Sequence, residues 1–202
     1  LKQINESQTF IKPNFSDNIN NGITPYEQRK KRFLYAGRID KSKGITVLFD
    51  AWQQMGAEAP ELLVCGTGPM EYWCRKYVDN HKLNQVHMLG YVPNSLLKML
   101  MADSLALILP TQLYEGFPMT IVEAYSTGTP VIGSDIGNVG SIIENNVTGW
   151  KFKADSAQDL AEKVKQASDI CTSVYAEYQK KYTPDRSYIL LKSIYKKICS
   201  KN

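Results

Sequence analysis

The chain has 202 residues, of which 43% are hydrophobic and 22% charged, a composition typical of one globular domain with room for a short appendage. No apolar run approaches about 18 residues, so neither a helical membrane span nor a signal peptide is expected from this sequence. The formal net charge is +4, and the cations near the C-terminus predict a solvated helix face, with a surface for anionic lipid or nucleic acid as the alternative.

The polar residues 24–32 predict a linker or surface loop. From residue 33 onward, short apolar runs alternate with amphipathic stretches. The apolar runs predict strands at Phe33–Ala36, Leu62–Cys65, Val86–Leu89, Leu105–Leu109, Val131–Gly133 and Trp150–Phe152. Because buried strands alternate with helices, we expect a Rossmann-like α/β fold, in which helices cover both faces of a mostly parallel sheet.

Helices are predicted between these strands by apolar spacing and by residues that favour helix ends. One apolar stripe runs over residues 45–52, and further helices are expected over 69–80, 95–102 and 118–126. The helix over 118–126 would begin with a proline and end before Gly128. Ser156 to Asp159 has the pattern of a capping box, and Thr183-Pro184 begins the last helix.

The cysteines and histidines indicate the compartment and bear on metal binding. The cysteines are Cys65, Cys74, Cys171 and Cys199. Their spacing is neither that of a metal site nor that of a secreted disulfide scaffold, so we expect reduced thiols in a cytoplasmic protein. With His81 and His87 as the only histidines, and no HxxxH or CxxC pair, no metal site is expected.

Parallel sheets bind ligands outside the carboxyl ends of their strands, so the loops that follow the predicted strands are candidate site loops. Each of them contains glycine or proline. They cover residues 37–44, 66–69, 90–93, 110–118 and 134–140.

The first loop carries Arg38, Lys41 and Lys43, followed by Gly44 at the start of a helix. Cations beside a helix N-terminus can form a binding site for a diphosphate. The alternative interpretation is that these are loop charges exposed to solvent. The loop is not a Walker A sequence. In the second loop, Gly66 and Gly68 allow close approach of a ligand or of a neighbouring loop, and a purely structural turn is equally compatible with them.

The segment over 109–130 is the most informative. Glu115 lies in a loop, where its carboxylate could accept hydrogen bonds from sugar hydroxyls. Glu123 lies about one and a half turns into the following helix, where it could accept two hydrogen bonds from a ribose diol. The amides between Gly116 and Thr120 would meet phosphate oxygens. A solvated loop acid and a helix N-terminal acid are the alternatives for the two glutamates.

Glu115 and Glu123 form an E-x7-E pattern within Tyr-Glu-Gly-Phe-Pro…Glu-Ala…Gly-Thr-Pro-Val. With Ala-Gly-Arg38…Lys43-Gly, Cys-Gly-Thr-Gly-Pro, Leu-Gly-Tyr-Val, Ser-Asp-Ile-Gly and Glu-Asn-Asn-Val-Thr-Gly, the chain resembles the C-terminal domain of family 4 glycosyltransferases, the glycosyl transferases group 1, which have the GT-B fold. The resemblance extends from about Phe33 to Ala167. It implies transfer of a sugar from a nucleotide diphosphate with retention of configuration, usually without a bound metal.

The resemblance also assigns roles to residues of this chain. It implies that Arg38 and Lys43 hold the diphosphate, that Glu115 touches the donor sugar, and that these three form the catalytic set. Glu123 would bind the ribose. The other donor-binding residues that we expect are Gly37, Gly66, Gly68, Tyr91, Val92, Gly116, Phe117, Pro118, Met119 and Thr120. Family frequency favours a UDP-sugar, with a GDP-sugar as the alternative.

The resemblance further implies a domain order. Residues 1–32 would form an interdomain linker, 33–182 the donor domain, and 183–202 a helix that packs toward an N-terminal acceptor domain. The face expected to do so carries Tyr188, Leu191, Tyr195 and Ile198. Because the chain begins without Met and lacks that domain, we expect a fragment that binds donor but transfers sugar poorly.

The acceptor would be a saccharide or a lipid-linked saccharide held by the N-terminal domain, with no role for nucleic acid. The full-length enzyme is expected at the inner face of the membrane. A related nucleotide-sugar enzyme, such as an epimerase or a glycogen-type synthase, and a non-catalytic nucleotide-sugar-binding module are the alternatives. The chain departs from the family pattern at Gly137–Ser141, where relatives often have Gly-Gly-x-Pro-Glu, so no role is assigned to Asn138.

Overall fold

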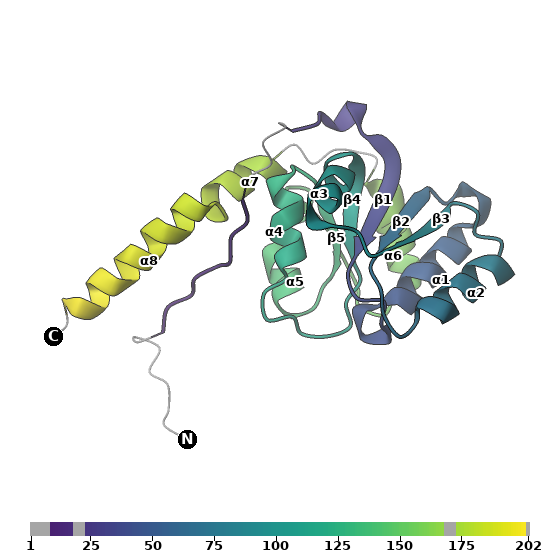
Figure 1. The fold of residues 1–202 in the computed structure, drawn as a ribbon, viewed down its shortest axis with the longest axis horizontal. Helices are drawn as coiled ribbons and strands as arrows, with labels where there is room; N and C mark the ends of the chain where they lie inside the picture. Colours follow the sequence, from purple (N-terminus) through teal and green to yellow (C-terminus); the bar gives the residue numbers. More distant parts are fainter. Residues whose placement is uncertain (1–8, 18–22, 168–172, 201–202) are drawn as a thin grey trace, which may run out of the picture.

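A six-stranded sheet with the order β3-β2-β1-β4-β5-β6 lies at the centre of the computed structural model, which describes residues 9–17, 23–167 and 173–200 (Figure 1). Every neighbouring pair of strands is parallel. The strands are β1 Lys30–Ala36, β2 Glu61–Cys65, β3 Val86–Gly90, β4 Ser104–Leu109, β5 Val131–Ser134 and β6 Gly149–Phe152. Each contains the predicted run, which confirms the predicted fold class.

Helices lie on both faces of this sheet. On one face α1 packs against α6, and on the other α3 contacts α4, which α7 covers in turn (Figure 1). The helices are α1 Ile45–Met55, α2 Glu71–Asn80, α3 Asn94–Ala102, α4 Met119–Ser126, α5 Gly137–Ile142, α6 Ala157–Gln166, α7 Val174–Lys181 and α8 Pro184–Cys199. Short 3-10 turns cover Tyr26–Gln28, Lys41–Lys43 and Gly56–Glu58.

The helix α1 shows why the apolar stripe predicts a helix. Ile45, Leu48, Phe49 and Trp52 are all fully buried against the sheet. Trp52 also satisfies its one polar atom, because Nε1 donates to the Pro60 carbonyl over 2.8 Å.

Helix ends follow the predicted capping residues with small differences. Helix α4 begins at Met119, one residue later than predicted, because Pro118 has extended backbone angles and forms the N-cap. Ser156 caps α6 by accepting from the Asp159 amide. The capping box is incomplete, because the Asp159 carboxylate accepts from the Lys153 amide at 2.6 Å instead of from the N-cap amide.

The prediction of a polar linker over 24–32 is wrong for its C-terminal part. Strand β1 begins at Lys30, and Arg29 is buried. The guanidinium of Arg29 donates to five acceptors, four of which lie on two distant segments at Ser104 and at residues 127–129, so the side chain is part of the interior and not of a linker. Lys30 joins the sheet because its amide donates to the Asp103 carbonyl.

Helix α8 extends away from the sheet (Figure 1). It begins at Pro184, as predicted, with Thr183 as the N-cap that accepts from the Arg186 amide. The predicted apolar face is exposed, with Tyr188 64% and Tyr195 62% accessible. In the part of the chain that the structure describes, no helix combines the length and the apolar character that a membrane crossing requires.

Candidate functional site

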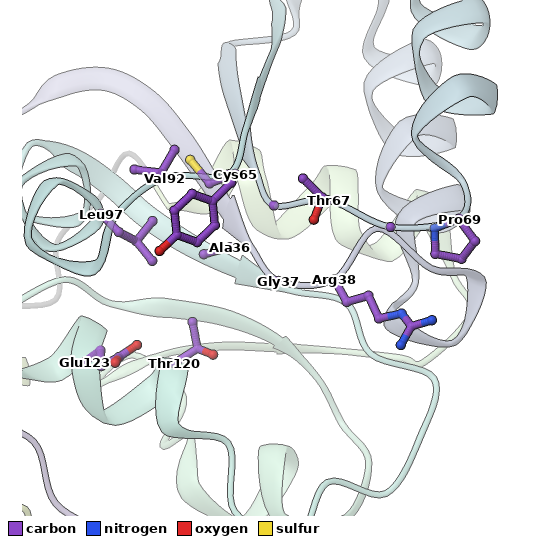
Figure 2. Close-up of a pocket in the computed structure, with 13 residues that line it drawn as sticks. Ala36, Gly37, Arg38, Cys65, Thr67, Pro69, Val92, Leu97, Thr120 and Glu123 are labelled. Atoms are coloured by element: carbon purple, nitrogen blue, oxygen red, sulfur yellow. The ribbon is translucent and has the colours of Figure 1, made fainter.

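A cavity of about 580 Å³ opens at the carboxyl ends of β1, β2 and β3, where the sequence predicts a ligand (Figure 2). Figure 2 shows Thr120 and Glu123, on α4, facing the loops that carry Arg38, Thr67 and Val92. The lining residues are Ala36, Gly37, Arg38, Cys65, Gly66, Thr67, Gly68, Pro69, Tyr91, Val92, Leu97, Thr120 and Glu123. Of these, Ala36, Cys65 and Leu97 were not predicted, whereas Thr67 and Pro69 lie in the predicted site loop over 66–69 without an assigned role.

The loop after β1 turns sharply so that Gly44 lies against Pro110, the residue that follows β4. Gly44 has φ +73, and a Cβ there would lie 1.7 Å from the Pro110 carbonyl oxygen, so only glycine allows this approach. Asp40 caps the turn by accepting from the Ser42 amide at 2.9 Å and from its hydroxyl at 2.7 Å. These hydrogen bonds, supported by the nearby Arg38 and Lys43, lower the pKa of the Asp40 carboxyl.

The loop geometry brings Lys43 and Glu115 together across 72 positions of sequence. Lys43 Nζ lies 2.6 Å from Glu115 Oε1. The same oxygen accepts from the hydroxyl of Thr111, which is buried just beyond the end of β4, over 3.0 Å. Two of the predicted catalytic residues therefore share one ion pair, and a buried threonine anchors its carboxylate.

Arg38 is more exposed than Lys43, the other cation expected to hold the diphosphate, since 68% of its side chain is accessible against 32% for Lys43. Its Nε lies 3.8 Å from Asp40 Oδ2, and the side chain extends toward the loop at Pro69 (Figure 2). The backbone beneath it is fixed, because the hydroxyl of Tyr35 donates to the Arg38 carbonyl over 2.7 Å. Burial raises the pKa of Tyr35, which keeps this donor protonated.

The glycines of the second loop are explained by the neighbouring loop. Gly66 has φ +139, and a Cβ there would lie 1.8 Å from the Gly37 carbonyl oxygen. A Cβ on Gly68 would lie 2.3 Å from the Ile39 carbonyl oxygen. Of the interpretations left open above, close approach of the neighbouring loop fits this geometry, and both glycines line the cavity as a result.

Glu123 lies on the cavity side of α4, with its carboxylate held from α3. Asn94, the first residue of α3, donates from Nδ2 to Glu123 Oε1 over 2.9 Å. Asn94 was not predicted, because the two residues are 29 positions apart and no motif joins them. One oxygen of the carboxylate is thus tied to the protein, which orients the other for a ligand.

The wall formed by β2, β3 and α3 is apolar. Tyr91 is 78% exposed, and Val92, Leu97 and Cys65 complete the wall. Burial raises the pKa of the Cys65 thiol to about 11, so at neutral pH it is a small apolar group and not a nucleophile. This wall suits a flat heterocycle, and the opposite side of the cavity suits charged groups.

The turn before α4 presents backbone and not side chains. Phe117 packs against the core, with its ring 6.4 Å from that of Tyr182, and Pro118 is buried. Pro118 has no N–H, so the prediction that it contributes an amide is wrong on chemical grounds. The first amides of a helix have no partner within the helix, which makes Met119 and Thr120 possible backbone donors, and Gly116 and Phe117 in the turn before α4 are the other candidates.

Arg38 and Glu123 line one cavity. Lys43 and Glu115 are not among its lining residues, but Lys43 lies further along the loop of Arg38 and pairs with Glu115, which lies in the turn between β4 and α4. The arrangement combines cations, which can bind phosphate groups, carboxylates, which can accept from hydroxyl groups, and an apolar wall, which can contact a flat ring. Within the described ranges, no group of three or more His, Cys, Asp or Glu side chains could hold a metal ion.

Comparisons with known proteins extend over most of the chain. The profile of the family described as glycosyl transferases group 1 matches residues 17–181. The glycogen synthase of Mycobacterium tuberculosis is 28% identical over 163 residues, which cover 75% of this chain and 39% of that protein. The chain therefore spans well under two thirds of the length of the curated relatives it matches.

Solved structures share the fold. The apo form of the lipopolysaccharide outer core galactosyltransferase WaaB superposes with a TM-score of 0.77 at 21% identity, over 94% of this chain and 55% of that one. Anabaena Alr3699/HepE in complex with UDP superposes with a TM-score of 0.73 at 19% identity, over 87% of this chain and 50% of that one.

Proposed function

Because this chain belongs to the family of glycosyl transferases group 1, we propose that it is the donor-binding domain of a retaining glycosyltransferase of polysaccharide biosynthesis. The donor is a sugar attached to UDP. The observation that carries the proposal is the convergence of Arg38, Lys43, Glu115 and Glu123 at one edge of the sheet.

The cations suit the chemistry of the departing diphosphate. When the bond between the sugar and the diphosphate breaks, negative charge grows on the phosphate oxygens. Groups fixed in place before the reaction stabilise that charge more in the transition state than in the ground state. Lys43 is held in this way by Glu115, at 2.6 Å, and Arg38 supplies a second cation. The amides at the start of α4 add the partial positive charge of a helix N-terminus to the diphosphate site.

The base, the ribose and the sugar of the donor are assigned to the remaining residues around the cavity. The base lies along Tyr91 and Val92, and Glu123 accepts from the ribose hydroxyls with the oxygen that Asn94 leaves free. Glu115 meets the sugar. UDP is preferred because the superposable Anabaena protein was solved in complex with UDP and with UDP-glucose.

The complete enzyme needs a second domain to hold the acceptor, and this domain would face the same edge of the sheet. The curated relatives are more than twice as long as the matched segment, which supports this proposal. The acceptor is a saccharide or a lipid-linked saccharide, and the enzyme works in the cytoplasm at the inner face of the membrane. The exposed apolar face of α8 is proposed to contact that second domain.

Nucleotide binding tests the proposal directly. In titration calorimetry of this chain, we expect UDP to bind and GDP and ADP to bind more weakly, because the neighbouring Anabaena structures hold UDP. Preference for GDP would change the donor but keep the function. If a folded chain binds none of the three nucleotides, the donor site is wrong.

Replacing Glu123 by alanine tests the ribose contact. A hydrogen bond to a charged group contributes about 1.5–3 kcal/mol, so we expect the affinity for UDP to fall by about tenfold or more. The same substitution should leave the affinity for 2′,3′-dideoxy-UDP unchanged, because this ligand lacks the hydroxyls. Equal losses for both ligands would show that Glu123 does not bind the ribose.

A further inference from the structure

The turn that carries Glu115 is held from outside the donor cavity by Asn138, a residue to which the sequence assigned no role. Asn138 is the second residue of α5 and is exposed. Its Nδ2 donates to the Glu115 carbonyl over 3.0 Å and to the Gly116 carbonyl. One side-chain amide therefore binds two consecutive carbonyls of the turn.

Because the peptide bond is planar, these contacts also fix the direction in which the next two backbone N–H groups point. In a trans peptide, the carbonyl of one residue and the N–H of the following residue point in opposite directions. Since Asn138 binds the carbonyls of Glu115 and Gly116, the N–H groups of Gly116 and Phe117 must point away from α5. These are two of the backbone donors proposed for the donor substrate.

Two further contacts fix the same turn. Gly137 has φ +50 and lies under the ring of Tyr114, where an added Cβ would come within 2.7 Å of Cδ1. The Glu115 carboxylate is bound by Thr111 and Lys43. The side chain of Glu115 is thus anchored at the end of β4, and its backbone is anchored at the start of α5.

We infer that Asn138 is a positioning residue for recognition of the donor sugar, through the orientation that it gives to Glu115 and to the amides of Gly116 and Phe117. This inference rests on the proposed function. The nucleotide part of the donor, including the diphosphate, is bound by other elements, namely the loop after β1, the wall at Tyr91 and the first amides of α4 at Met119 and Thr120. This leaves the amides of Gly116 and Phe117 for the sugar. Loss of Asn138 therefore affects the sugar and leaves the nucleotide contacts in place.

The test compares UDP with UDP-sugars on two variants. Asn138→Asp keeps the size of the side chain but replaces the donor by an oxygen that faces two carbonyl oxygens, and Asn138→Ala removes the contact. We expect the affinity for the tighter of UDP-glucose and UDP-galactose to fall by about three- to tenfold, as loss of one or two hydrogen bonds implies. The affinity for UDP should stay within about twofold. In hydrogen-exchange mass spectrometry, the protection that the bound UDP-sugar gives to the amides of residues 115–117 should be weaker in both variants.

Ser141→Ala is the matched control, because Ser141 is an exposed polar residue on α5 whose hydroxyl donates to the Gly137 carbonyl of the same helix. It should change neither affinity. The inference is overturned if UDP and the UDP-sugar weaken by the same factor, which indicates a general structural role, or if both affinities and the exchange rates stay at the wild-type value. If the wild type binds none of UDP, GDP and ADP, the proposed function itself fails, and the inference fails with it.

Discussion

Replacing Arg29 by methionine should lower the free energy of unfolding by about 3–5 kcal/mol, a large part of the total stability of a domain. Methionine keeps much of the length of the arginine stem but none of its donors. In the native protein, the acceptors of the guanidinium are the carbonyls of Thr24, Ser104, Thr127 and Gly128 and the hydroxyl of Thr129. The substitution leaves several of these buried acceptors without a donor.

The cost is large because Arg29 joins segments that are distant in sequence. It holds the start of β1 to the start of β4 and to the turn between α4 and β5, up to 100 positions away. Burial lowers the pKa of the guanidinium, yet arginine keeps its charge at neutral pH, so the buried charge depends on these carbonyls. Arg29→Lys should recover only a fraction of the loss, since an ammonium cannot form the same fork of donors.

Lys31→Met is the control, because Lys31 lies only two positions further on, in β1, and is exposed. Urea unfolding followed by tryptophan fluorescence gives the free energy of unfolding of each variant. The comparison is valid if the m-value, the slope of this free energy against urea concentration, is unchanged. The control should change the stability by less than about 0.5 kcal/mol. A loss of less than about 1 kcal/mol for Arg29→Met would contradict the interpretation of Arg29 as a structural centre.

Arg29 also shows what the sequence can and cannot predict. The strands were predictable because both faces of a parallel sheet are covered, so each strand is a continuous apolar run. A stretch of Arg-Lys-Lys-Arg has no such signal, and a charged side chain enters the interior only when partners from elsewhere are present. The partners of Arg29 come from other strands and turns, so local sequence could not reveal them.

Helix α7 was missed for a related reason. Its buried side chains are Val174 and Tyr178, a single pair one turn apart, which is too short a pattern to separate from a loop. The hydroxyl of Tyr178 donates to the Ser16 carbonyl, 162 positions away, so this helix depends on a distant segment.

At the site, the motifs identified the residues but not their contacts. The E-x7-E spacing placed Glu123 in a helix and Glu115 before it, as observed. The spacing held no information on Asn94, Thr111 or Asn138, which orient these carboxylates and the turn. Such contacts depend on which loops meet at the strand ends, and that is decided by glycines such as Gly44, where a Cβ would collide with a carbonyl.

Lys43→Met should reduce the affinity of this chain for UDP by about 10- to 100-fold, the largest loss that we expect from a single site residue. The side chain of Lys43 is only 32% accessible, and its ammonium is held 2.6 Å from Glu115 before any ligand arrives. A cation fixed in this way contributes more to binding than a solvated one, because less side-chain freedom is lost when the diphosphate binds.

Lys41 provides the matched control, since it belongs to the same 3-10 turn, Lys41–Lys43, but is exposed. Both substitutions remove one positive charge, so any general effect of net charge on an anionic ligand is the same for the two variants. We therefore expect Lys41→Met to change the affinity for UDP by less than about twofold in the same calorimetric titration. Equal losses from the two variants would mean that only the total charge of the loop attracts the nucleotide. In that case the contact between Lys43 and Glu115 would have no part in holding the diphosphate.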